Sequence, residues 1–175
     1  SEDFDNVRKS GLIAIRLRPD DSLQWVKEVS KGQEVFFVTS NGQCIRFNEK
    51  DCRPMGRPSI GVRGVKLKDS DTVVEMDVVR TKEAEVLVVM ENGLGKSSKI
   101  ANYRMQNRGG SGIKVAQITA KTGKVIGAKI YDSKENADVI LCSKLGQIIR
   151  LALKDVPTQG RTTQGVYVMR FKRGD

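Results

Sequence analysis

Short apolar runs separated by turn signals recur along the chain. In one of them, residues 35–38 read Val-Phe-Phe-Val, the pair Asn41-Gly42 follows, and residues 44–47 read Cys-Ile-Arg-Phe. Short runs rich in Val, Ile and aromatic side chains are typical of β-strands, and an Asn-Gly pair between two such runs is a strong signal for a tight turn. The pattern predicts a β-hairpin across residues 35–47.

This pattern occurs three times. Residues 33–67, 84–118 and 137–171 align without a gap, and they begin 51 and 53 residues apart. Residues 11–17 (GLIAIRL) match the last part of the unit at residues 61–67 (GVRGVKL), so the chain enters in mid-repeat. The shared columns include Val35/Val86/Val139, Gly42/Gly93/Gly146, Arg57/Arg108/Arg161 and Gly61/Gly112/Gly165. We expect one repeat domain over residues 1–175, with a half unit at 1–32 and units at 33–83, 84–136 and 137–175.

Two further strands are predicted in each unit. The connectors at residues 23–29, 73–79 and 125–131 are rich in Val and Ile, and so are the unit ends at 62–67, 113–118 and 166–171. Four strands in each stretch of about 50 residues indicate a radial array of four-stranded sheets, because one such sheet cannot bury both faces alone. The predicted fold is all-β, a propeller-like array of about three and a half repeats, which is too few to close a full ring. It is either an open array or a fragment of a longer one.

A glycine-rich column precedes the shared arginine. Gly56, Asn107 and Gly160 occupy it, and Gly and Asn are the residues that tolerate a left-handed backbone at least cost. The column predicts a turn with positive φ that presents the arginine in the same pose in each unit.

Positive charge is concentrated in one part of each unit. The chain has 31 Lys and Arg against 21 Asp and Glu, a net charge of +10 and a pI near 9.7. Residues 42–67, 93–118 and 146–171 hold 15 of the basic residues and only three of the acidic ones. Because equivalent segments of a radial array occupy equivalent positions, these charges are expected to line up along one rim. Such a stripe suits duplex DNA, whose charges lie about 1.7 Å apart, although a solvated charged face is the simpler alternative.

The middle unit departs from its neighbours. Lys96 shares a column with Ile45 and Ile149, and Ser98 shares one with Phe47 and Leu151. The residues from 93 to 118 also include no acid. These differences indicate either a blade specialised for an anion or a local irregularity of the repeat.

Several function classes are disfavoured by the sequence. No apolar run approaches the roughly 20 residues of a membrane span, and the acidic N-terminus lacks the pattern of a signal peptide, so a cytoplasmic location is expected. The three cysteines, Cys44, Cys52 and Cys142, are odd in number and widely spaced, which argues against a disulfide framework or a zinc site. The chain has no His, so the commonest general base and a common metal ligand are both missing. Gly95-Lys96-Ser97 ends like a P-loop, but Met90 stands where the first glycine belongs. We expect no catalytic residues, no metal and no cofactor.

One stretch resembles a known family. YRMQNRGGSGIK, residues 103–114, is similar to the Tyr-Arg-x-Gln-x-Arg-Gly-Gly-Lys-Gly pattern in the C-terminal domain of the bacterial DNA gyrase A protein, and residues 55–67 and 159–171 look like the corresponding segments of that domain. Asn107 and Ser111 replace the two other basic positions of the family's box, so the stretch resembles a later blade that carries a relative of it. The family implies a β-pinwheel with strand exchange between blades. It also implies a basic rim that wraps duplex DNA in support of ATP-dependent negative supercoiling.

The resemblance also implies the partners and the site. The partners would be double-stranded DNA, the remainder of the gyrase A protein and, through it, the gyrase B protein, in the bacterial cytoplasm at the nucleoid and away from any membrane. Two alternatives are the C-terminal domain of the corresponding protein of topoisomerase IV and a protein-interaction propeller. The residues expected to contact DNA are Arg46, Arg57, Arg63, Lys96, Lys99, Arg104, Gln106, Arg108, Gly109, Gly110, Lys114, Arg150 and Arg161.

Overall fold

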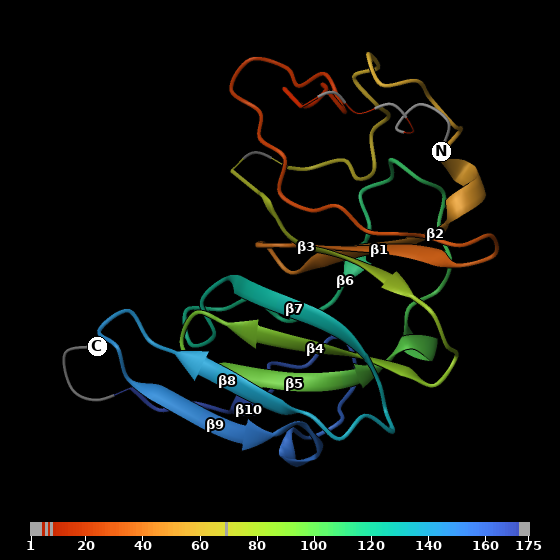
Figure 1. Ribbon diagram of the computed structural model, residues 1–175. Coiled ribbons are helices and arrows are strands. Elements are labelled where there is room, and N and C mark those ends of the chain that lie inside the picture. Colours follow the sequence, from red (N-terminus) through yellow and green to blue (C-terminus); the bar gives the residue numbers. More distant parts are fainter. Residues whose placement is uncertain (1–4, 6, 8, 69, 172–175) are drawn as a thin grey trace.

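The computed structural model describes residues 5, 7, 9–68 and 70–171, and these residues form β-strands joined by turns and three 3-10 turns, with no α-helix among them (Figure 1). Blade A has the strand order β3-β1-β2-β6, blade B has the order β7-β4-β5-β10, and hairpin C consists of β8 and β9. The bounds in blade A are β1 Glu34–Thr39, β2 Gln43–Asn48, β3 Val73–Val79 and β6 Ile113–Lys114. Those in blade B and hairpin C are β4 Ala84–Met90, β5 Leu94–Lys99, β7 Val125–Asp132, β8 Asp138–Cys142, β9 Ile148–Ala152 and β10 Val166–Tyr167. The 3-10 turns η2 Glu49–Asp51, η3 Ile100–Asn102 and η4 Leu153–Asp155 follow β2, β5 and β9.

The three hairpins form as the glycine column predicts. Gly42, Gly93 and Gly146 all have positive φ, at 74°, 78° and 85°. In the first hairpin the Gly42 N–H donates to the Thr39 carbonyl at 3.0 Å, which closes the turn between β1 and β2. Only glycine adopts this backbone without strain, so the same turn recurs at the same place in each unit.

The fourth strand of each complete blade comes from the following unit. In blade A, β6 pairs with β2 through Cys44 and Ile113, and in blade B, β10 pairs with β5 through Gly95 and Val166. The second and third units thus each complete the sheet of the unit before them. This is the strand exchange that the family resemblance implies.

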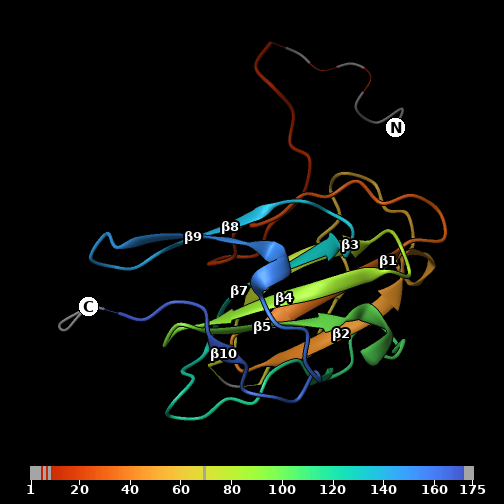
Figure 2. The same ribbon diagram turned by 90° about the horizontal axis from the view of Figure 1, so that it is seen from below.

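The main core lies between blades A and B. Phe36, Val38 and Cys44 face this core from blade A, and Val86 and Val88 face it from blade B. Figures 1 and 2 show the two sheets lying face to face. Burial of these apolar side chains is what holds one blade to the next.

Hairpin C packs on the opposite face of blade B. Leu87 meets Leu153 and Val156 there in a smaller buried cluster. The outward face of the hairpin stays uncovered, because Ile140 and Ile148 are 69% and 68% exposed, whereas their counterparts Phe36 and Cys44 in blade A are buried.

Two predicted strands are absent. Residues 23–29 and 62–67 form no strand, although the other connectors, at 73–79 and 125–131, do. By the pairing seen in blades A and B, both segments would pair with the hairpin of the unit before residue 33. The half unit contributes no hairpin among the described residues, so the two segments have no strand to pair with.

The prediction of positive φ at Gly56, Asn107 and Gly160 was wrong. Positive φ occurs instead at the column Gly61, Gly112 and Gly165, with values of 92°, 77° and 80°. In blade B a Cβ at Gly165 would lie 2.5 Å from the Gly95 carbonyl oxygen in the neighbouring strand. Glycine is therefore required where each unit end approaches the preceding blade, not at the turn before the arginine.

Candidate nucleic-acid interface

The basic segments of the units lie along the outer edges of the sheets. At the other edge β3 and β7 meet, where the Ile130 N–H and the Lys129 ammonium both contact the Asp77 carboxylate, at 3.2 and 2.9 Å. Residues 42–67, 93–118 and 146–171 supply β2, β5 and β9, the 3-10 turns and the outermost strands β6 and β10. We call these three segments the rim segments. These segments thus run along the perimeter of the array.

Most of the rim cations are exposed. Arg53 and Arg104, which share a column, are exposed at the start of the loops that follow η2 and η3. The other exposed basic side chains of the rim segments are Lys50, Arg63, Lys66, Lys99, Lys114, Arg150, Lys154 and Arg170. Of the residues expected from sequence to bind DNA, Arg63, Lys99, Arg104 and Lys114 are exposed and have no side-chain partner within the described chain, whereas Arg150 forms an ion pair with Asp138.

Arg46 has a structural role instead of the expected phosphate contact. Its Nε donates to the Glu34 carboxylate at 2.5 Å, and its Nη1 donates to the carbonyls of Ile100 and Tyr103 at 2.9 and 2.8 Å. The side chain is only 13% exposed. Arg46 thus joins blade A to the turn after β5 in blade B, and its Nε and Nη1 already have hydrogen-bond partners within the protein.

Lys96 is also placed where no phosphate can reach it. The side chain is fully buried, and its Nζ donates to the carbonyls of Gly160 and Arg161 at 2.8 and 2.7 Å and to Thr163 Oγ1 at 3.2 Å. Burial, with a smaller effect of the Arg161 charge, lowers the pKa of Lys96 to about 8. In place of the expected exposed position, Lys96 makes structural contacts that hold the loop at residues 160–163.

Other polar side chains around the middle unit point inward as well. Ser97 Oγ and Tyr131 Oη both donate to the Glu85 carboxylate, at 2.7 and 2.9 Å, and Thr158 Oγ1 joins them at 3.1 Å. Ser98 is fully buried. Of the two interpretations of this unit, a local polar arrangement inside the fold agrees with the structure.

The three arginines of the shared column, Arg57, Arg108 and Arg161, are half-buried. Arg57 Nη1 donates to the Ile13 carbonyl at 3.4 Å, Arg108 Nη1 to the Arg63 carbonyl at 2.5 Å, and Arg161 Nη1 to the Lys114 carbonyl at 2.9 Å. Arg108 Nε also donates to the Asp51 carbonyl, at 2.8 Å. One side of each guanidinium is therefore used within the protein.

The glycine loop next to Arg108 lies against the end of the preceding unit. Gly109 has a φ of 80°, and its N–H donates to the Gly64 carbonyl at 2.7 Å, while the Gly110 carbonyl accepts from the Lys66 N–H at 2.9 Å. The Gln106 N–H donates to the Arg46 carbonyl at 2.8 Å. The loop thus forms part of the contact between two units, and Gly110 lies at its exposed edge.

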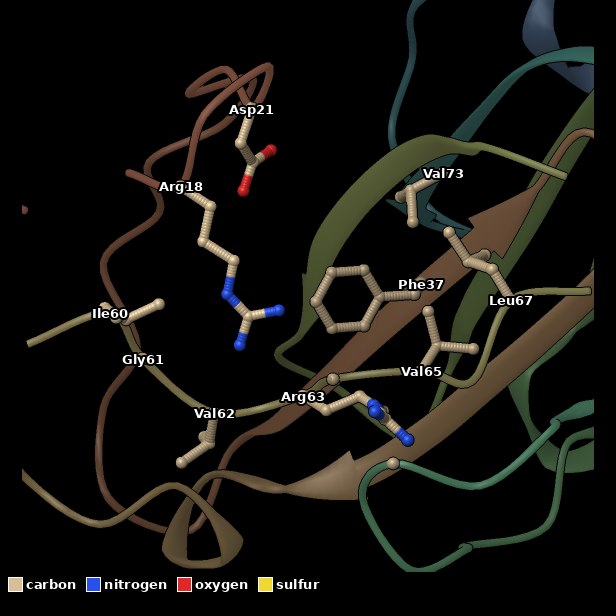
Figure 3. Close-up of a pocket in the computed structure, with 12 residues that line it drawn as sticks. Arg18, Asp21, Phe37, Ile60, Gly61, Val62, Arg63, Val65, Leu67 and Val73 are labelled. Atoms are coloured by element: carbon tan, nitrogen blue, oxygen red, sulfur yellow. The ribbon is translucent and has the colours of Figure 1, made fainter. Parts of the chain in front are cut away.

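An open cavity of about 710 Å³ lies at the start of the array (Figure 3). Phe37, Val65 and Val73 form its apolar side, and Figure 3 shows the Arg18 guanidinium directed toward the Phe37 ring. It lies on the face of blade A that is turned away from blade B, beside the half unit. Arg63 contributes to its wall, so the basic rim continues to this end of the molecule.

The structure offers no arrangement for metal chemistry in the part of the chain that it describes. No group of three or more His, Cys, Asp or Glu side chains could share an ion among these residues. Burial raises the pKa of the Cys44 thiol to about 12, which is the behaviour of a packing residue and not of a nucleophile.

The family model for the DNA gyrase C-terminal domain, a β-propeller, matches residues 1–30, 33–80, 84–132 and 137–175. The chain belongs to this family. The DNA gyrase A protein of Staphylococcus epidermidis is 40% identical over 172 residues, and that of Staphylococcus aureus is 40% identical over 169 residues. These alignments cover 98% and 96% of this chain but 19% of each relative, so the chain spans about a fifth of the length of the curated relatives it matches.

Solved structures support the same fold. A structure of a DNA gyrase A C-terminal domain superposes with a TM-score of 0.81 and 29% identity, covering 94% of this chain and 56% of that one. The C-terminal domain of a DNA topoisomerase IV superposes with a TM-score of 0.87 at 23% identity, covering 97% and 52%. At that identity the second likeness shows the fold alone, while the sequence relatives above are gyrase A proteins.

The predicted all-β pinwheel and the resemblance to gyrase A are thus confirmed. The chain corresponds to the C-terminal domain of gyrase A, which is a non-catalytic region of a type IIA topoisomerase. Within residues 5, 7, 9–68 and 70–171, no helix has the length and apolar character needed to cross a bilayer.

Proposed function

We propose that this domain binds duplex DNA along its outer rim and bends it, and that it thereby supports ATP-dependent negative supercoiling by gyrase. It would act with the remainder of the gyrase A protein and, through it, with the gyrase B protein, at the nucleoid in the bacterial cytoplasm. One observation carries the proposal. The exposed cations of all three units occupy equivalent rim elements, whereas the acids of the sheets lie mainly elsewhere.

Exposed rim cations match the chemistry of a phosphate backbone. Each cation that neutralises a phosphate releases condensed counterions, which gives affinity that falls steeply with salt. Arg53 and Arg104 would act at equivalent points of successive blades, together with Lys99 on β5 of blade B and Lys114 on β6 of blade A. A duplex that followed such a perimeter would bend, at a cost on the order of 1–6 kcal/mol for a site of 20–30 base pairs, and repeated contacts would offset this cost.

The binding would be independent of sequence. The exposed rim cations lie on turns and on strands at the sheet edges, where long Lys and Arg side chains suit phosphate contacts, which carry no sequence information. Single-stranded nucleic acid is usually held by stacking aromatic side chains, and only 5% of the residues here are aromatic. Phosphate contacts on a duplex are the interaction that the rim can make.

The proposal is tested by titrating the protein with random-sequence duplexes of about 20, 40 and 150 base pairs between low and physiological salt. We expect steep salt dependence and an affinity that rises on the longer duplexes by more than the number of added sites explains. Weak or salt-insensitive binding at every length would contradict the proposal and would favour a protein partner for the rim. Lys82→Ala/Lys124→Ala, at exposed positions outside the rim segments, serves as a control and should bind like the unmodified protein.

A further inference from the structure

The shared arginine is one half of a two-point contact that occurs three times. In each unit its Nη1 donates to the carbonyl of one residue near the end of the preceding unit, and these residues, Ile13, Arg63 and Lys114, all occupy the same column. The side chain thus reaches backward along the array, across the boundary between two units.

The second point is a backbone hydrogen bond in the opposite direction. The Lys66 N–H donates to the Gly110 carbonyl at 2.9 Å, and the Gln117 N–H donates to the Thr163 carbonyl at 3.3 Å. At the half unit, the Arg16 N–H donates to the Ser59 carbonyl at 3.4 Å. The three donors share one column, and the three acceptors share another, two residues after the shared arginine. We call the arginine contact and this backbone contact together the clasp.

We propose that the clasp sets the spacing between successive blades, and that Arg57, Arg108 and Arg161 are positioning residues and not phosphate contacts. The clasp joins the loop of one unit to the end of the preceding unit, and at Arg161 that end is itself the fourth strand of a neighbouring sheet. Arg161, for example, holds the carbonyl of Lys114 in β6, which pairs with β2 of blade A. A single side chain of the third unit therefore fixes a strand of the first blade.

The clasp at Arg108 is the most extensive of the three. It alone adds the bond from Arg108 Nε to the Asp51 carbonyl and the bond from the Gly109 N–H to the Gly64 carbonyl, at 2.8 and 2.7 Å. The glycine loop at residues 109–112 brings the backbone close enough for these contacts. The loop that resembles the family's box thus serves first to lock two units together.

The consequence for DNA rests on the proposed function. If the clasp sets the blade spacing, it determines the curvature of the rim and hence how well a long duplex follows it. Exposed cations such as Arg104 would supply the phosphate contacts. Loss of a clasp should then reduce the preference for long duplexes without changing the number of phosphates neutralised.

The test compares Arg108→Ala and Arg108→Lys with Arg104→Ala. Amide hydrogen exchange without DNA should be faster at Lys66 and Gly109 in both Arg108 variants and unchanged in Arg104→Ala. In the salt titration on a short duplex, Arg104→Ala should reduce the slope of log K against log salt by about 0.9, whereas the Arg108 variants should keep the slope. On the 150-base-pair duplex the Arg108 variants should lose the length advantage.

The lysine variant separates charge from geometry. It retains a positive charge, but one ammonium cannot replace a guanidinium that contacts two carbonyls through different nitrogens. A normal length advantage and normal exchange in Arg108→Lys, or a reduced salt slope in Arg108→Ala, would overturn the proposal. If the unmodified protein fails to bind DNA, the proposed function is wrong, while the exchange data still decide whether the clasp exists.

Discussion

At the scale of the residue, basic side chains of this domain have two different uses. Arg46 and Lys96 donate their hydrogen bonds to carboxylate or carbonyl oxygens inside the protein. Lys99 and Arg104, in contrast, are exposed and have no partner in the described chain. Sequence shows which segments are basic, but not which cation faces inward, since Lys96 and Lys99 lie on the same strand. The exposure of each side chain in the structure distinguishes the cations that bind inside the protein from those that face solvent.

Lys96→Ala is predicted to destabilise the protein without changing its phosphate contacts. The variant leaves a cavity and removes three hydrogen bonds, so the free energy of unfolding should fall by about 2–4 kcal/mol in urea denaturation. The salt slope of DNA binding should stay the same, because the ammonium is fully buried. In the matched variant Lys99→Ala the unfolding free energy should change by less than about 0.5 kcal/mol and the slope should fall. A reduced slope in Lys96→Ala would contradict this assignment.

The buried thiol of Cys44 is predicted to lower the free energy of unfolding at alkaline pH. Burial raises the pKa of its thiol from 9.0 to about 12, so the folded state retains a proton that the unfolded state releases. The resulting stabilisation is complete below pH 9 and is lost as the pH rises toward 12. Chemical denaturation at pH 8, 9 and 10 should show a falling free energy of unfolding, with a shallower fall in Cys44→Ala. Equal slopes for the two proteins would exclude Cys44 as the cause.

At the scale of the element, local patterns are readable from sequence and pairing between units is not. The hairpins around Gly42, Gly93 and Gly146 were predicted correctly, because a short apolar run and a turn glycine act within a few residues. The positive φ was misplaced at Gly56, since the demand for glycine at Gly112 and Gly165 comes from the backbone of a strand in another unit. The arginine column was visible, but its acceptors are backbone carbonyls, which carry no sequence signal.

Glycine at the entry to the fourth strand is predicted to be indispensable. Gly165→Ala would place a Cβ 2.5 Å from the Gly95 carbonyl oxygen on a backbone with a φ of 80°, which should cost at least about 2 kcal/mol of unfolding free energy. Gly127→Ala is the control, because no atom lies within 4 Å of a Cβ there and φ is not positive. Urea denaturation followed by circular dichroism measures both variants. Equal stabilities would show that the close approach of β10 to β5 is not required.

At the scale of the whole molecule, strand exchange and charge placement have the same origin. The strands β6 and β10, which come from the second and third units, lie at the outer edge of the preceding sheets, so these parts of the repeat are at the perimeter. Charges placed in that part of the repeat are therefore carried to the rim of each blade in turn. A repeat of about 50 residues can thus build a long basic surface from a few side chains in each unit.

Charge position, rather than net charge, is predicted to control DNA binding. Arg53→Ala/Arg104→Ala/Lys154→Ala removes three exposed cations from the rim segments, and Lys82→Ala/Lys124→Ala/Lys134→Ala removes three exposed cations from outside them. Both variants lower the net charge equally, so a protein that attracted DNA only through its overall field would lose the same affinity in each. We expect the salt slope to fall by roughly 2 to 3 in the rim variant and to stay constant in the other, since each lost phosphate contact contributes about 0.9. Equal losses in a titration on a 40-base-pair duplex would show that the rim is no more than a charged, solvated face.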